Sequence, residues 1–324
     1  MRRRRCAAAC IAAAGIAGTL LLALTSFAAP PTRPPRPRPA AWNATTTLER
    51  AVREQRAVTV AELFARARAA AGVAAAPTDA SIARAWRRRR PTPLVVRAPR
   101  LAYVRVFKAG NDALHHHMLH VWANATAGPA VTFTFVRDPL ARFASAYGEI
   151  EMRLTERCAG DAAAAAAAAV FLRAAPAARP RAFLADFVLG PGLAAYRGAR
   201  AAGGESCLLR EAVLEHAWPM ASFVAPLRPG FVGRLETFDD DLRRLAARVG
   251  APLPWDPALG RHGAVAAERL SFEAARRRAQ AALRSDAGVR RAACYLYFDD
   301  FSRFGYDVPP ECRRLPVTTA RGVP

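Results

Sequence analysis

A single lysine stands where a predicted strand gives way to a predicted helix. Residues 101–107 alternate in polarity and are rich in β-branched and aromatic side chains, which predicts a strand. A turn beginning at Lys108 and containing Gly110 follows, and residues 113–122 have a helical pattern. A strand, a glycine-bearing turn and a helix direct backbone N–H groups and the helix dipole toward an anion. The predicted anion site is the turn of Lys108, Ala109, Gly110 and Asn111.

Composition makes this lysine unusual. The 324 residues include 48 Lys and Arg, of which only Lys108 is Lys, and the formal net charge is +22. A lone lysine can survive by chance, but a crowded turn around a phosphate accepts a compact ammonium and excludes a wide guanidinium. The charge favours polyanionic partners such as nucleotides, nucleic acid, acidic polysaccharide or anionic membrane. The spacing differs from GxxxxGK[ST], so this is no ordinary ATP-binding loop.

A second strand and helix follow with a second pair of phosphate-binding side chains. Residues 131–136 (VTFTFV) predict a strand, and Pro139 suits the first turn of a helix that continues over 140–154. Arg137 at the strand end and Ser145 in the helix can converge on one phosphate. Asp138 is expected to cap the helix. The alternative for Arg137 is a structural salt bridge.

Histidines on the first predicted helix are the candidates for a general base. His116 and His120 share a face at the i, i+4 spacing, and imidazole suits proton transfer near neutral pH. Glu149 or Glu151 is the competing, acidic base. No carboxylate or third ligand lies near the histidines in sequence, so no metal site is expected.

Four segments resemble Golgi carbohydrate sulfotransferases, in particular the chondroitin, dermatan and HNK-1 sulfotransferases. Residues 135–147 (FVRDPLARFASAY) closely resemble their 3′-phosphate-binding segment, and the Lys108 turn resembles the start of their 5′-phosphosulfate loop. Residues 231–236 (FVGRLE), followed by Asp240 or Asp241, resemble a third block. Residues 295–306 resemble the C-terminal ending, so the blocks span about residues 101–307 in the family's order.

The resemblance implies an enzyme that transfers a sulfuryl group from 3′-phosphoadenosine 5′-phosphosulfate (PAPS) to a carbohydrate hydroxyl. It implies an α/β fold with a P-loop-like central parallel sheet, helices on both faces, and PAPS at the carboxyl ends of the strands. Lys108 would bind the 5′-phosphosulfate, and Arg137 and Ser145 the 3′-phosphate. The chain departs from the family pattern at Asn111 and Asp112, where a small or Ser/Thr residue and then Thr are usual.

The resemblance also bears on Arg234 and His216. Arg234 replaces the more usual lysine of the third block, in keeping with the arginine bias. His216 lies in a His-x-x-Pro segment, where it either lines the acceptor cleft or packs in the core. The arginine-rich stretch 271–283 is expected to be a helix flanking the cleft.

The N-terminus predicts a membrane anchor. Four arginines precede an uncharged run over residues 6–29, which as a helix would measure about 36 Å, against about 30 Å of bilayer hydrocarbon. Residues 1–29 are therefore expected to be a signal-anchor, with the catalytic domain in the Golgi lumen as a single-pass type II protein. A cleavable signal peptide and an organelle transit peptide are the alternatives.

The remaining chain divides by composition. We expect a Pro/Arg-rich stem and helical linker over residues 30–93, the sulfotransferase domain over 94–312, and a tail over 313–324. The four cysteines outside the anchor can form two disulfides in three connectivities; they are Cys158, Cys207, Cys294 and Cys312. The alanine run over 162–169 is expected to be a surface insert.

The expected partners are an anionic or neutral glycan acceptor and, through the anchor, a membrane. A nucleic-acid partner is not expected because the anchor disfavours it. Two other functions fit parts of the sequence. One is a kinase-like nucleotide-dependent transferase, and the other is a membrane-tethered protein that binds polyanions through its charge alone.

Overall fold

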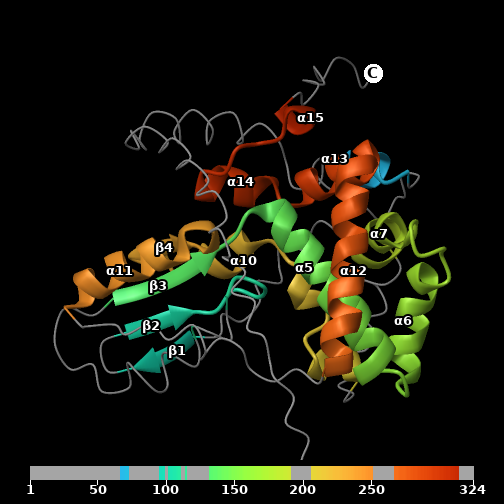
Figure 1. Cartoon of the computed structure of the whole chain (residues 1–324), viewed down its shortest axis with the longest axis horizontal. Coiled ribbons are helices and arrows are strands. Elements are labelled where there is room, and N and C mark those ends of the chain that lie inside the picture. The colour runs from blue at the N-terminus through green and yellow to red at the C-terminus, as the bar shows by residue number, and fades with distance from the viewer. Residues whose placement is uncertain are drawn as a thin grey trace, which may run out of the picture. The chain divides into compact units, whose positions relative to one another are not determined.

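The computed structural model describes residues 66–72, 95–98, 101–110, 114, 131–190, 206–250 and 266–313 (Figure 1). All of them belong to the second of two compact units, residues 1–43 and 44–324. The predicted anchor and most of the predicted stem and linker lie outside the described residues. Asn111, His116 and His120 lie outside them as well.

A four-stranded sheet forms one side of the described domain. Its order is β1 (Val95–Ala98), β2 (Leu101–Val104), β3 (Val131–Val136) and β4 (Phe231–Arg234). The last three strands are parallel, with Tyr103 opposite Phe133 and Val136 opposite Arg234. The predicted α/β fold with a central parallel sheet is confirmed. Strand β1 adds an antiparallel edge that the sequence did not predict.

Alternation along β3 places its aromatic side chains on one face of the sheet. Phe133 and Phe135 are fully buried and pack with Leu242 and Leu245 of α11 (Phe238–Val249). On the opposite face Thr134 donates a hydrogen bond from its hydroxyl to the Val104 carbonyl of β2, at 2.8 Å. The three aspartates of residues 239–241 occupy the first turn of α11, where their charge suits the helix dipole.

The other helices lie beyond the carboxyl ends of the strands, and the larger core cluster is among them (Figure 1). In chain order they include α5 (Pro139–Met152), α6 (Ala162–Leu172), α7 (Arg179–Ala182), α9 (Cys207–Arg210), α10 (Met220–Val224), α12 (Ala266–Ser285), α13 (Ala287–Leu296), α14 (Phe298–Phe304) and α15 (Pro310–Arg313). A π-helical turn over Arg153–Arg157 extends α5, and a second one covers Phe183–Val188. A short 3₁₀ helix covers Leu214–Ala217.

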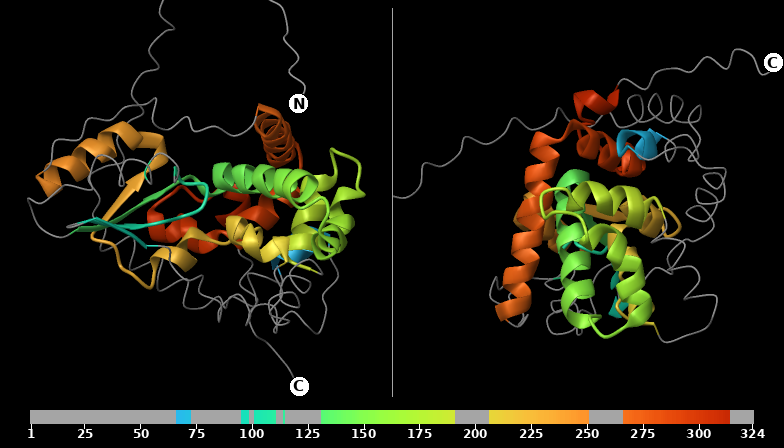
Figure 2. Two further views of the ribbon diagram at one scale, coloured as in Figure 1. Left: turned by 90° about the horizontal axis from the view of Figure 1, so that it is seen from below. Right: turned by 90° about the vertical axis from the view of Figure 1, so that its right-hand side faces the viewer.

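Helix α5 starts and packs as its sequence dictates. Asp138 accepts a hydrogen bond from the Ala141 N–H at 2.8 Å, and Pro139 occupies the first helical position. Helix α12 runs beside α5 (Figures 1 and 2). The two helices meet at Gly148, where a Cβ atom would lie 2.9 Å from the Phe272 carbonyl oxygen. Only glycine allows this close approach.

The alanine run is part of the fold and not the expected surface insert. Its residues form α6, capped by Asp161, and Ala164, Ala167 and Ala168 are buried against the larger core cluster. Alanine has the highest helix propensity, and its small side chain lets the helix lie close to the neighbouring π-helical turn.

Two disulfides connect segments of this helical part. Cys158 bonds to Cys207, and Cys294 bonds to Cys312. This is one of the three connectivities that the four cysteines allow. Disulfides persist in oxidising compartments, so the bonds are those of a domain of the secretory pathway.

We expect Gly148→Val to destabilise the domain by about 1–3 kcal/mol, because the added side chain meets the α12 backbone and forces the two helices apart. The matched control is Gly160→Val, since a Cβ atom at Gly160 meets nothing within 4 Å. Urea unfolding of both variants measures the difference. Equal stability of the two variants would show that α5 and α12 do not depend on this approach.

Candidate active site

The turn after β2 is closed by a hydrogen bond from the Ala109 N–H to the Val106 carbonyl and contains two left-handed residues. Lys108 adopts φ 62° and Gly110 φ 79°, both in the left-handed region. The Leu114 N–H donates to the Gly110 carbonyl at 3.1 Å, as in the first turn of a helix. A Cβ atom at Gly110 would lie 2.9 Å from a methyl carbon of Leu235, so this position requires glycine. A left-handed lysine costs about 1–3 kcal/mol, and such strain is concentrated at functional sites.

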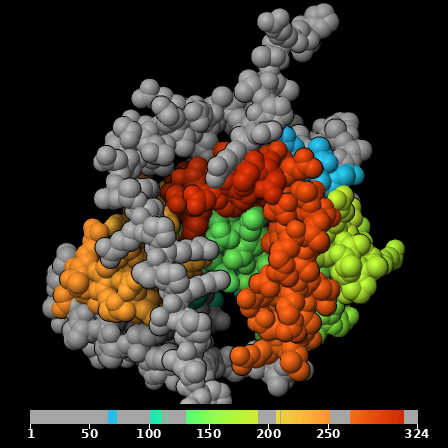
Figure 3. All heavy atoms as spheres, turned by 45° about the horizontal axis from the view of Figure 1, so that its top comes forward, coloured from blue at the N-terminus to red at the C-terminus, as the bar shows by residue number. Residues whose placement is uncertain are grey.

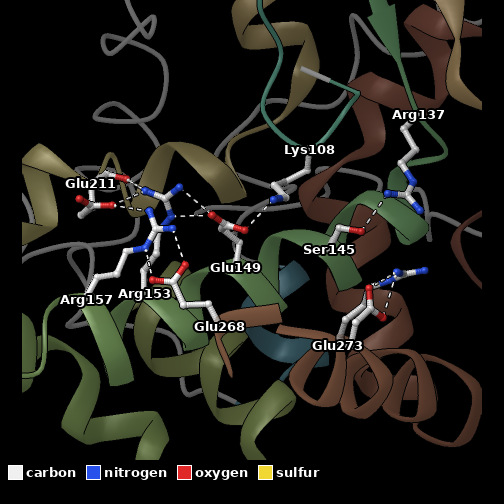
Figure 4. A network of polar contacts seen from close by, with 10 residues as sticks. Lys108, Arg137, Ser145, Glu149, Arg153, Arg157, Glu211, Glu268 and Glu273 are labelled. Carbon is white, nitrogen blue, oxygen red and sulfur yellow. Dashed lines mark hydrogen bonds and ion pairs between the residues drawn. The ribbon is translucent and has the colours of Figure 1, made fainter. Parts of the chain in front are cut away.

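Two helices hold the Lys108 ammonium. Its Nζ lies 2.6 Å from Glu149 Oε2 on α5 and 5.0 Å from the centre of the Phe272 ring on α12. The Lys108 side chain is 20% exposed. Figure 4 shows Lys108 pointing toward Glu149 from the loop above α5.

Arg137 and Ser145 are in contact. The Arg137 guanidinium donates to the Ser145 hydroxyl at 2.9 Å (Figure 4). Burial and the nearby positive charge of Arg276 lower the pKa of Arg137. The buried Arg276 Nε has no hydrogen-bond partner among the residues that the structure describes. Arg276 pairs with Glu273 on α12 at 3.0 Å, while Arg137 and the Ser145 hydroxyl together offer the kind of donors that fit a phosphate group.

The third and fourth blocks of the sequence hold the Arg137 turn in place. Glu236 accepts hydrogen bonds from the Asp138 N–H at 2.7 Å and from the Tyr306 hydroxyl at 2.9 Å. Arg234 donates to the Phe304 and Gly305 carbonyls, and its guanidinium lies 4.7 Å from the Tyr306 ring centre. Arg234 therefore connects two blocks of the chain.

The aspartates after β4 have structural contacts. Asp241 is buried and accepts hydrogen bonds from the Arg234 N–H at 2.7 Å and the Thr237 hydroxyl at 2.8 Å. Asp240 is exposed and pairs with Arg243 on the same helix. No group of three or more His, Cys, Asp or Glu suited to a metal ion occurs among the described residues.

Arg142 connects the segment before the lysine turn with the segment that carries His216. It is fully buried and donates to the Phe107 carbonyl at 3.0 Å and the His216 carbonyl at 3.2 Å. The His216 ring lies 4.5 Å from the Phe107 ring centre, and its Nδ1 has no partner within the described part of the chain. Burial, with the charges of Lys108 and Arg153, keeps the pKa of His216 well below its usual value. His216 is therefore a neutral, buried side chain just behind the lysine turn.

The C-terminal block holds the segment that carries His216. Asp300 is fully buried and accepts hydrogen bonds from the N–H groups of Met220 and Ala221, at 2.9 and 2.7 Å. The Tyr297 hydroxyl donates to the Ala217 carbonyl at 2.7 Å.

Figure 3 shows green atoms of the β3–α5 segment at the bottom of a hollow between α12 and the C-terminal helices.

The two glutamates proposed as alternative bases have different surroundings. Glu151 is buried and accepts from Arg179 and Arg278, at 2.9 and 2.6 Å, away from the lysine turn. Glu149 lies at the turn itself. Burial raises its pKa, but the charges of Lys108 and Arg153 and the hydrogen bond from Lys108 outweigh this effect and lower the value to about 2. Glu149 is therefore ionised at neutral pH.

The contacts of three residues at the site were not expected from the sequence: Phe272, Arg276 and Arg153. The first two lie on α12, which includes the helix predicted over 271–283, but nothing in the local pattern distinguishes them from its other residues. Arg153 follows Glu149 at the i, i+4 spacing, which is a recognisable signal for an ion pair on a helix.

Glu149 makes the stability of the protein depend on acid pH. Its folded pKa of about 2 is below its usual 4.5, so its stabilising contribution is complete above 4.5 and is lost as pH falls toward 2. Between pH 5.5 and pH 3, we expect the free energy of unfolding of the wild type to fall by about 1–3 kcal/mol more than that of Glu149→Gln. Urea unfolding across this range measures both curves, and parallel curves would contradict the assignment.

Comparison with known proteins gives one match. The model of a family described as the sulfotransferase family matches residues 109–307, which starts one residue after Lys108 and includes α5, α12 and the C-terminal block. No curated protein and no solved structure matches the chain. No helix of the described residues is long and apolar enough to cross a membrane, and the predicted anchor lies outside them. The match covers more than half of the chain and agrees with the resemblance seen in the sequence, so the chain belongs to the sulfotransferase family, whose members use PAPS.

Proposed function

We propose that this protein transfers a sulfuryl group from PAPS to a hydroxyl group of a glycan or proteoglycan. One observation carries the proposal. Glu149, the partner of Lys108, and Ser145, the partner of Arg137, are four residues apart on α5, which is about 6 Å along one helix face. The two cationic groups at the ends of β2 and β3 therefore flank one helix face, an arrangement that suits a nucleotide with phosphate groups at both 5′ and 3′ positions.

Different residues bind the two ends of the donor. Lys108 and the turn residues Ala109, Gly110 and Asn111 bind the 5′-phosphosulfate. Arg137 and Ser145 bind the 3′-phosphate through charge-assisted hydrogen bonds, worth about 1.5–3 kcal/mol each. Arg276 adds a second guanidinium to this end.

PAPS supplies the sulfuryl group: the acceptor oxygen bonds to sulfur, the bond from sulfur to the 5′-phosphate oxygen breaks, and that oxygen keeps the electron pair. Lys108 stabilises the negative charge that grows on this oxygen, as positioned cations do in phosphoryl transfer. A general base takes the proton of the acceptor hydroxyl. The candidates are His116 and His120, which share a face of the helix predicted after the lysine turn.

The setting of the enzyme follows from the predicted segments. Residues 1–29 anchor the protein in the Golgi membrane as a type II protein, and 30–93 form the stem and helical linker, of which Ala67 and Ala71 pack in the core of the domain. Residues 94–312 form the lumenal catalytic domain, which the two disulfides support. The positive charge of the chain suits an anionic glycan acceptor, with a neutral glycan as the second choice.

We expect Lys108→Ala to lower the rate of transfer by at least about 100-fold, because the charge on the leaving oxygen loses its cation. Arg137→Ala should weaken binding of adenosine 3′,5′-bisphosphate (PAP) about 10-fold or more. Transfer of labelled sulfate to a panel of glycans and calorimetry with PAP measure these effects. Arg243→Ala, an exposed arginine on α11, is the matched control. Binding of ATP with Mg²⁺, but not of PAP, would overturn the proposed function.

We expect His116→Ala or His120→Ala to lower kcat about 100-fold or more, since loss of a general base commonly costs this much. The affinity for PAP should be unchanged, because a base that acts on the acceptor does not bind the donor. His115→Ala is the control from the same histidine run. An equal loss with His115→Ala, or no loss with either variant, would place the base elsewhere.

A further inference from the structure

We infer that Glu149 is the counterion of Lys108 in the donor-free enzyme, and that PAPS must displace it from the ammonium to bind. Glu149 would thus govern how tightly the site holds the 5′ end of the nucleotide. This inference rests on the proposed function, since it assigns Lys108 to the donor phosphosulfate.

The geometry of the pair shows a direct competition for one ammonium. Glu149 Oε2 lies 2.6 Å from Lys108 Nζ, the distance of a charge-assisted hydrogen bond. The Glu149 side chain is 10% exposed and that of Lys108 20%, so water screens the pair weakly. A phosphosulfate oxygen that approaches Nζ therefore meets a carboxylate already in place and must share or replace it.

A row of ion pairs holds the carboxylate in this position. Glu149 Oε1 accepts from Arg153 at 2.7 Å, and Arg153 also donates to Glu211 at 2.6 Å. Arg157 then pairs with Glu211 at 3.3 Å and with Glu268 of α12 at 2.8 Å (Figure 4). Arg153 and Arg157 lie at the two ends of the π-helical turn, which presents both side chains to Glu211.

A disulfide holds the segments of Arg157 and Glu211 together. Cys158 directly follows Arg157, and its partner Cys207 begins the short helix α9, four residues before Glu211. The bond therefore keeps Glu211 against Arg153 and Arg157. When Lys108 moves to the donor, Glu149 cannot follow it, because Arg153 holds the other oxygen. The ammonium is the mobile partner, and the carboxylate is the fixed one.

The expected effect on binding has a definite sign. Removing the Glu149 charge frees the ammonium and removes repulsion between the carboxylate and the incoming phosphate, so donor binding becomes tighter. The neighbouring buried carboxylate of Glu151 does not compete for Lys108, since it pairs with Arg179 and Arg278. The effect must also be confined to the 5′ end, because the 3′-phosphate residues Arg137 and Ser145 do not contact Glu149 in the described hydrogen bonds and ion pairs.

The experiment is calorimetry of the full chain with PAP and with adenosine 3′-monophosphate, which lacks the 5′-phosphate. We expect Glu149→Gln to bind PAP about 10-fold tighter and the monophosphate within about twofold of wild type. In a Lys108→Met background, Glu149→Gln should raise the affinity for PAP by less than about threefold, because no ammonium is left to free. Glu149→Asp should give a smaller gain of the same sign and replaces Glu149→Gln if that variant does not fold.

Asp240→Asn is the matched control, because it removes one negative charge from an exposed ion pair on α11 and should leave both affinities unchanged. Unchanged or weaker PAP binding by Glu149→Gln would overturn the inference. An equal gain for the monophosphate would also overturn it, since the effect would then be a general change in charge. A wild-type protein that does not bind PAP would instead overturn the proposed function.

Discussion

The close packing of α5 against α12 at Gly148 is the constraint on which the site depends. Helix α5 carries Ser145 and Glu149, the partners of the two strand-end cations, and α12 brings Phe272 against one cation and Arg276 near the other. A larger side chain at the crossing would separate all of these groups at once. Rigid helices that place several groups together are a precise way to build a site, because loops alone would leave the distances loose.

Local patterns in the sequence predicted the parts of this arrangement that local physics decides. The β3 strand is observed over the predicted residues 131–136, and Asp138 and Pro139 begin α5 as capping rules require. The parallel sheet and the family were predicted through the four sequence blocks. The alanine run was interpreted wrongly, because a run without polar residues gives no signal of which face is buried.

Contacts between distant segments could not be predicted in the same way. Glu149 was considered only as a base, since its approach to Lys108 joins residues 41 positions apart. Arg276 and Phe272 reach the site only because Gly148 permits the crossing of two helices. The disulfide connectivity was open for the same reason, because spacing alone cannot tell which cysteines the fold brings together. Asn111, His116 and His120 remain predictions from the sequence.

The row of ion pairs also gives a physical reason for the one lysine in a chain otherwise rich in arginine. Arg153 already occupies Glu149 Oε1 through two of its nitrogens, at 2.7 and 2.6 Å, and leaves Oε2 for a single further donor. An ammonium is a compact point charge that can take one oxygen, lie over the Phe272 ring and turn toward a donor phosphate. A second guanidinium prefers both oxygens of a carboxylate and would compete with Arg153 for them. The position therefore favours lysine on geometric grounds, whatever bias shaped the rest of the composition.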